Sequence, residues 1–186
     1  MEITQTSIPG VLLIQPTVFE DSRGYFFESY SQKKFADNHM AFDWVQDNQS
    51  SSSYGVIRGL HYQLNPFAQT KLVRVFRGTI LDVVVDIRKG SPYYGKHFSV
   101  ELSAENKIQI LVPQGFAHGF SVLSDKAEVL YKCDNYYHKN SEAGIIYNDP
   151  SLAIDWKIPA DKAIISEKDL ILPGLSDIKS NFEFTA

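Results

Sequence analysis

The chain has 186 residues, a formal net charge of −4 and a hydrophobic content of 44%. This length suffices for one domain with a substantial core, and we expect a single domain over residues 1–186. The acidic balance argues against general nucleic-acid binding, although a local cluster of cations could still hold an anionic small molecule.

Cysteine content and hydropathy restrict the cellular compartments in which we expect the protein. The one cysteine, Cys133, excludes an intramolecular disulfide and favours a reducing cytoplasm. Residues 1–10 lack a basic region followed by an apolar run, so we expect no secretory signal. No stretch approaches the ~20 apolar residues that span a bilayer, so we expect no membrane association.

The first third of the chain mixes short strands, turns and one helix. In chain order we expect a strand at Val11–Ile14, a turn at Asp21–Gly24, a strand at Tyr25–Tyr30, a helix at Ser31–Asn38, a strand at Phe42–Asn48 and a polar loop at Ser50–Gly55. Asp and Gly supply the turn geometry, and Ser31 can cap the helix.

From Val56 onward the pattern is nearly all β, because apolar runs alternate with turn-rich separators. We expect strands at Val56–Gln63, Lys71–Arg77, Thr79–Arg88, Lys96–Leu102, Gln109–Val112, Ala117–Leu123 and Ala127–Asn135, and a helical turn at Ser166–Asp169. Many short strands at regular spacing predict an all-β antiparallel sandwich or barrel with a few short helices.

Strand parity places reactive side chains in line with apolar ones. Lys71 shares a face with two valines, His118 shares a face with two phenylalanines, and Tyr131 shares a face with Val129. Such stripes predict a pocket lined by polar groups inside the barrel. Arg58 is three residues from His61 and should face the other way, so a shared ligand would require a bulge near Gly59.

Each reactive residue also has a structural interpretation. His61 is the candidate base, and the alternative is a core histidine. That alternative is weakened by Arg58 and Lys71, because polar groups are costly to bury without a ligand. Lys71 is a candidate oxyanion holder or a surface lysine, and Tyr131 a candidate acid or a packed strand tyrosine. His118 suits packing as well as function, and these patterns identify no acid to orient His61.

A metal site and a serine or cysteine nucleophile are not indicated. A jelly-roll metal centre needs His-x-His with further inward ligands, and the corresponding place here reads His61-Tyr62-Gln63. We therefore expect no metal and no cofactor. The chain has no Gly-x-Ser-x-Gly motif, and Cys133 lies in no nucleophile motif.

Ten stretches of sequence, in order along the chain to about Asp169, form one set of motifs: Phe19–Tyr30, Gln46–Asn48, Arg58–Gln63, Gln69–Arg74, Asp82–Arg88 with Ser91-Pro92, Leu102–Asn106, Pro113–Phe120, Leu130–Lys132, Asn148–Pro150 and Ser166–Asp169. Taken together, these motifs resemble the dTDP-4-dehydrorhamnose 3,5-epimerase family. One departure is Thr70, where the family usually has glycine before the lysine.

The resemblance implies a cupin-like jelly roll that works as a homodimer without a metal. It implies a thymidine diphosphate sugar with a C4 ketone as substrate, inverted at C3 and C5 through an enolate. By match to the family's motifs, His61 would be the base and Tyr131 the acid, Lys71 would steady the enolate, and Asp169 would pair with His61. The residues that fall where the family contacts its ligand are Arg23, Glu28, Gln46, Asp47, Asn48, Arg58, His118, Glu142 and Lys168.

The first strand is commonly exchanged in such dimers, so Arg23 and Glu28 would serve the partner's site. Two other functions stay open: an epimerase that acts at one carbon only or on another nucleotide, and a sugar-binding jelly roll without activity. A metal-dependent cupin is a third alternative.

Overall fold

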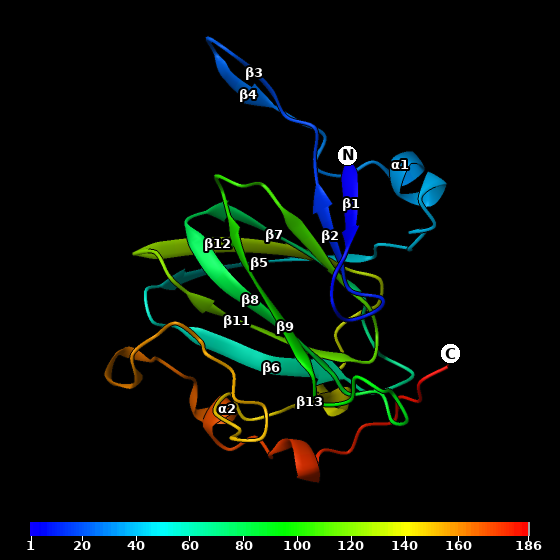
Figure 1. Cartoon of the computed structure of the whole chain (residues 1–186), viewed down its shortest axis with the longest axis vertical. Helices are drawn as coiled ribbons and strands as arrows, with labels where there is room; N and C mark the ends of the chain where they lie inside the picture. Colours follow the sequence, from blue (N-terminus) through cyan, green and yellow to red (C-terminus); the bar gives the residue numbers. More distant parts are fainter. Residues whose placement is uncertain (186) are drawn as a thin grey trace.

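Two antiparallel β-sheets face each other in the computed structural model, which describes residues 1–185 (Figure 1). The first sheet has the strand order β1 (Glu2–Gln5), β2 (Leu12–Gln15), β10 (Gln109–Val112), β7 (Lys71–Arg77), β12 (Lys126–Cys133) and β5 (Gln46–Ser53). The second has the order β13 (Glu142–Gly144), β6 (Ile57–Gln63), β11 (Phe116–Val122), β8 (Thr79–Asp86) and β9 (His97–Ser103). The expected all-β, cupin-like jelly roll is confirmed.

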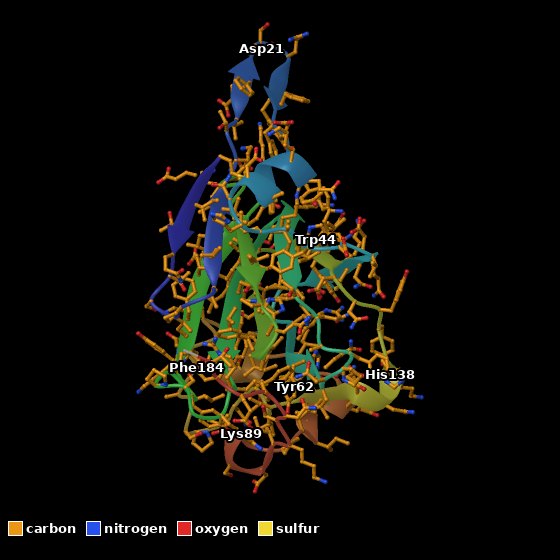
Figure 2. All side chains as sticks on the ribbon, turned by 90° about the vertical axis from the view of Figure 1, so that its right-hand side faces the viewer. Asp21, Trp44, Tyr62, Lys89, His138 and Phe184 are labelled. Carbon is orange, nitrogen blue, oxygen red and sulfur yellow. The ribbon has the colours of Figure 1, made fainter. Side chains whose placement is uncertain are left out.

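Helices are few and short, and one hairpin leaves the body of the molecule. The helices are α1 (Gln32–Asp37) and α2 (Glu167–Leu170), with 3₁₀ turns at Lys139–Ser141, Ala160–Lys162 and Leu175–Asp177. The hairpin consists of β3 (Phe19–Asp21) and β4 (Gly24–Phe26), and it projects away from the sheets with Asp21 at its tip (Figures 1 and 2). Among residues 1–185, no helix is long and apolar enough to cross a membrane.

The main core fills the space between the two sheets. The first sheet contributes Val73, Ile110 and Val129 to it, and the second contributes Val84 and Phe120. All five side chains are at most 5% exposed. Burial of these inward-facing residues at alternate positions is what selects the strand register, because a slip by one residue would turn every apolar side chain to the other face.

The outer face of each sheet is covered by a different segment. Residues between Ile145 and Phe182 pack on the second sheet against Leu60 and Val83. Phe35 of α1 packs on the first sheet against Leu72. Strands buried on both faces read as continuous apolar runs rather than alternating ones, as β8 does.

Four expectations for local structure are wrong. Ser50–Gly55 was expected as a loop, but β5 continues to Ser53, because its backbone pairs with β12 along the full strand and an edge strand tolerates polar side chains. The regular strand begins at Gln46 rather than Phe42, and β4 ends at Phe26 rather than Tyr30. Ser31 precedes α1 without a side-chain capping bond.

Candidate active site

A cavity of about 490 Å³ opens into the jelly roll between the sheets. Eight of the side chains proposed from the sequence line it: Arg58, His61, Lys71, His118, Tyr131, Glu142, Lys168 and Asp169. They come from strands of both sheets and from α2, so segments more than 100 residues apart in the chain meet at one wall. This concentration of titratable groups in one concave space is typical of a catalytic site.

The remaining candidates lie at three different places. Gln46 and Asn48 line a smaller adjoining cavity of about 150 Å³, which shares His61, Lys71 and Tyr131 with the main one. Asp47 points the opposite way along β5 and forms an ion pair with Lys132 at 3.1 Å. Strand alternation explains the split, because successive side chains point to opposite faces.

Arg23 and Glu28 are not brought to this chain's cavity. Arg23 lies in the projecting hairpin, its side chain is 88% exposed, and it pairs with Asp21 two residues away. Glu28 pairs with Lys34 on the surface. Within one protomer these two residues are therefore separated from the other candidates.

A histidine–aspartate pair forms one wall of the cavity. His61 Nε2 lies 2.7 Å from Asp169 Oδ1, and Asp169 is 3% exposed. Ser166 caps α2 by accepting a hydrogen bond from the Asp169 amide at 3.2 Å, which fixes the first helical turn that carries the carboxylate. Since a carboxylate can only accept this bond, Nε2 donates it, and in the neutral ring Nδ1 carries the lone pair that can take a further proton.

The charge state of Asp169 follows from its surroundings. Burial alone would raise its pKa, but the hydrogen bond from His61, the electrostatic interaction with that ring, the Gly59 amide and the charge of Lys168 outweigh burial. The pKa of Asp169 is lowered as a result, so the group is a carboxylate at neutral pH.

A bulge in β6 brings Arg58 and His61 to the same cavity, as the sequence predicted. His61 pairs with His118 on β11, whereas Arg58 pairs with Phe120, so three steps on β6 match two on β11. Gly59 at the bulge has φ +123°, and a Cβ there would lie 2.6 Å from the Gly119 Cα. Glycine is required because any side chain would force the two strands apart.

Tyr131 and Lys71 occupy the opposite sheet. They lie on the paired strands β12 and β7, and Lys71 Nζ is 5.8 Å from the centre of the Tyr131 ring. Burial raises the pKa of Tyr131, so its phenol keeps the proton. Burial also lowers the pKa of Lys71, although the charges of Asp82 and Glu142 act against this shift.

A second histidine–aspartate pair was missed by the sequence analysis. His118 Nε2 lies 2.8 Å from Asp82 Oδ2, and Asp82 is completely buried. Asp82 Oδ1 has no hydrogen-bond partner among residues 1–185. The signal was present in the sequence, because Asp82 interrupts the apolar run of β8 at an inward position.

A third polar group joins the rim of the cavity to α2. Glu142 Oε1 accepts from Lys168 Nζ at 2.8 Å, and Glu142 Oε2 accepts from the Tyr137 hydroxyl at 2.9 Å. Burial would raise the pKa of Glu142, but these two hydrogen bonds outweigh it and lower the pKa. Tyr137 was not singled out from the sequence, since nothing in its local pattern distinguishes it from a surface tyrosine.

The side chains that line the cavity suit proton transfer. Within the described part of the chain, residues 1–185, no three His, Cys, Asp or Glu side chains are grouped to hold a metal ion. The cavity instead offers an imidazole with an orienting carboxylate, a protonated phenol on the opposite wall, and the amine of the partly buried Lys71 beside it. These are the groups needed to remove a proton next to a carbonyl, stabilise the resulting oxyanion and return a proton from the other side.

Comparison with known proteins agrees with the chemistry that these side chains suggest. The family model described as dTDP-4-dehydrorhamnose 3,5-epimerase matches residues 5–177. The Shigella flexneri dTDP-4-dehydrorhamnose 3,5-epimerase is 52% identical over 171 residues, which is 91% of this chain and 93% of the relative.

Solved structures agree over nearly the whole fold. The dTDP-4-dehydrorhamnose 3,5-epimerase of Elizabethkingia anophelis superposes with a TM-score of 0.90 at 51% identity, covering 95% of this chain and 97% of the other. The Legionella pneumophila dTDP-6-deoxy-D-glucose-3,5-epimerase, solved with dTDP-4-keto-L-rhamnose, gives 0.95 at 44% identity, covering 100% and 99%. The chain belongs to the dTDP-4-dehydrorhamnose 3,5-epimerase family.

Proposed function

We propose that this chain is an isomerase that inverts C3 and C5 of dTDP-4-dehydro-6-deoxy-glucose, giving dTDP-4-dehydro-rhamnose for dTDP-rhamnose biosynthesis. One observation carries the proposal: His61, which pairs with Asp169 of α2, and Tyr131 lie on opposite sheets and line one cavity with Lys71. The keto sugar bound in the Legionella relative supports the substrate class.

The first half of the reaction forms an enolate. The C4 ketone acidifies the hydrogens on C3 and C5, because loss of either gives an enolate whose charge lies on the C4 oxygen. His61 takes the proton through Nδ1, while Asp169 stabilises the imidazolium that results. The ammonium of Lys71 stabilises the developing oxyanion, an effect worth about 10²–10³ in rate for one such donor.

The second half returns a proton to the opposite face of the ring. Tyr131 supplies it, because its phenol stays protonated and its strand lies in the sheet opposite β6. Arg58 and Lys168 bind the diphosphate, since cationic donors suit phosphate oxygens. His118, Glu142, Gln46 and Asn48 complete the contacts with the ligand.

We also propose that the enzyme is a homodimer of single-domain chains in the cytoplasm. The projecting hairpin exposes Phe19, Tyr25 and Phe26 by 60% or more, and such aromatic surface usually packs against a partner. An exchanged hairpin would carry Arg23 and Glu28 to the partner's cavity. The free thiol of Cys133 suits a reducing compartment.

Deuterium incorporation tests the reaction. The protein is incubated with dTDP-4-keto-6-deoxyglucose in D₂O, and proton NMR locates the label. We expect deuterium at both C3 and C5 with the ring couplings of the inverted product, and none with His61→Ala. Label at one carbon alone would identify a single-centre epimerase, and tight binding without label would identify a sugar-binding protein.

A complementation experiment tests the exchanged hairpin. Arg23→Ala and His61→Ala are prepared separately and then mixed under conditions that exchange subunits. A heterodimer would contain one cavity with both His61 and the partner's hairpin arginine, so activity should reappear in the mixture. Activity no higher than the sum of the two variants, with subunit exchange shown by sedimentation of differently tagged chains, would reject the shared site.

A further inference from the structure

Ser50 on the edge strand β5 presents a hydroxyl that the fold does not satisfy. Its Oγ is shielded from solvent and has no hydrogen-bond partner among residues 1–185. The residue nevertheless lines the main cavity together with Arg58 and Tyr131. Buried polar groups in native proteins are almost always paired, so an unpaired hydroxyl at a cavity wall calls for a partner from outside the chain.

The alternation of β5 makes this side chain part of an inward stripe. Asn48 contacts Cys133 Sγ, and Ser52 Oγ accepts from Arg58 Nε at 3.0 Å, so both neighbours two residues away are already engaged. Ser50 lies between them, directly across from Val129 of β12. Val129 carries no polar side-chain atom, and Ser50 lines the cavity, so a polar group bound in the cavity can supply the missing partner.

The geometry of serine allows that bond to form when a ligand enters. Rotation about χ1 moves Oγ between three staggered positions, and no internal hydrogen bond holds it in any of them. A hydroxyl can donate or accept, so it suits either a sugar hydroxyl or a phosphate oxygen. Ser50 lies between Asn48, which pairs with Tyr131, and Ser52, which holds Arg58. With the roles proposed above for Tyr131 and Arg58, this position faces the junction of sugar and diphosphate.

We propose that Ser50 is a further substrate-contacting residue, which hydrogen-bonds an oxygen in the sugar-phosphate half of the nucleotide sugar. The identity of this ligand rests on the function proposed above. A purely structural serine would have its partner within the chain, whereas this hydroxyl gains its partner only on binding.

The test compares Ser50→Ala with Ser51→Ala. Ser51 is the matched control, because it is the next residue of the same strand and its exposed side chain points to the other face. Calorimetric titration with dTDP and with dTDP-glucose gives the affinities, kinetics with the keto sugar gives kcat/KM, and thermal melting without ligand gives stability. We expect Ser50→Ala to weaken dTDP-glucose binding and lower kcat/KM by about 3- to 10-fold, as for loss of one neutral hydrogen bond.

The outcomes separate the possibilities. Loss of affinity for dTDP-glucose alone supports a bond to the sugar, and an equal loss for dTDP supports a bond to phosphate. In both cases the Tm of ligand-free Ser50→Ala should equal or exceed that of wild type, and Ser51→Ala should match wild type throughout. Unchanged affinity and kcat/KM in Ser50→Ala, or a Tm several degrees lower, overturns the proposal. A wild-type protein that neither binds dTDP nor converts the keto sugar refutes the proposed function itself and this inference with it.

Discussion

Replacing Asp169 by asparagine removes the charge that faces His61 while keeping the size of the side chain. Asp169 Oδ1 lies 2.7 Å from His61 Nε2, and the carboxylate is 3% exposed. An asparagine amide can present its oxygen to the Nε2 proton, but it cannot offset the positive charge that the ring gains when it takes a proton from the substrate. The variant should therefore bind substrate normally and react slowly.

The size of the loss follows from this one contact. A hydrogen bond to a charged group contributes about 1.5–3 kcal/mol, which corresponds to a fall in kcat of about 10- to 150-fold. The loss should stay below that of His61→Ala, because removing a general base costs about 10²–10⁴-fold. KM should change little, since Asp169 acts through His61.

Rates of deuterium uptake at C3 and C5 measure the proton-removal step directly. His61→Ala and the double variant His61→Ala/Asp169→Asn should be equally slow, because Asp169 has no role in proton removal once the imidazole is gone. Multiplicative losses in the double variant, or a raised KM with unchanged kcat, would refute the reasoning.

The pH dependence of stability gives a control. Because the pKa of Asp169 is lowered in the folded protein, its charge stabilises the fold above about pH 4, and this contribution disappears as the pH falls through the lowered pKa. The stability difference between wild type and variant should accordingly shrink in acid.

Three other substitutions test the remaining parts of the site. Tyr131→Phe should keep deuterium exchange but slow inversion by about 10²–10⁴-fold, measured by the ring couplings of the product; equal loss of both would argue against a proton from the second face. Lys71→Met should lower kcat by about 10²–10³-fold. As the pH is raised, the wild-type rate should begin to fall below pH 10.4, the approximate pKa of an ordinary lysine, because burial lowers the pKa of Lys71. Gly59→Ala should destabilise the protein in urea by more than Gly90→Ala: both glycines have positive φ, which alone costs about 1–2 kcal/mol, but only at Gly59 would a Cβ meet the neighbouring strand.

The sequence predicts the strands well where apolar runs are bounded by turns. The β7 and β10 boundaries match the prediction to the residue, because both strands contribute apolar side chains to the core and end at clear turns. The prediction fails at Ser50–Ser53, the second half of β5, where a run of serines resembles a loop. Pairing of that backbone with β12 outweighs the weak strand preference of serine, and an inspection of local residues cannot reveal such pairing.

For the site, parity and motif residues identified the individual groups, and the fold supplied the pairings. The bulge at Gly59 follows from the spacing of Arg58 and His61, because the two cannot share a face of a regular strand. Asp82 was missed because its partner, His118, lies 36 residues away in sequence and on a neighbouring strand. Long-range pairing of this kind depends on the strand order, which residue patterns do not determine.

The inward-facing side chains that build the core also set the distances between the reactive groups of the cavity. Lys71 continues the inward face of Val73, and Tyr131 continues that of Val129, while His118 lies between two core phenylalanines. The proposed base belongs to one sheet and the proposed acid to the other, so core packing between the sheets fixes the gap between them. Protein interiors are close-packed and do not deform continuously. Truncation of a core residue next to the cavity should therefore affect proton transfer as well as stability, because packing between the sheets holds the two walls of the cavity at their distance.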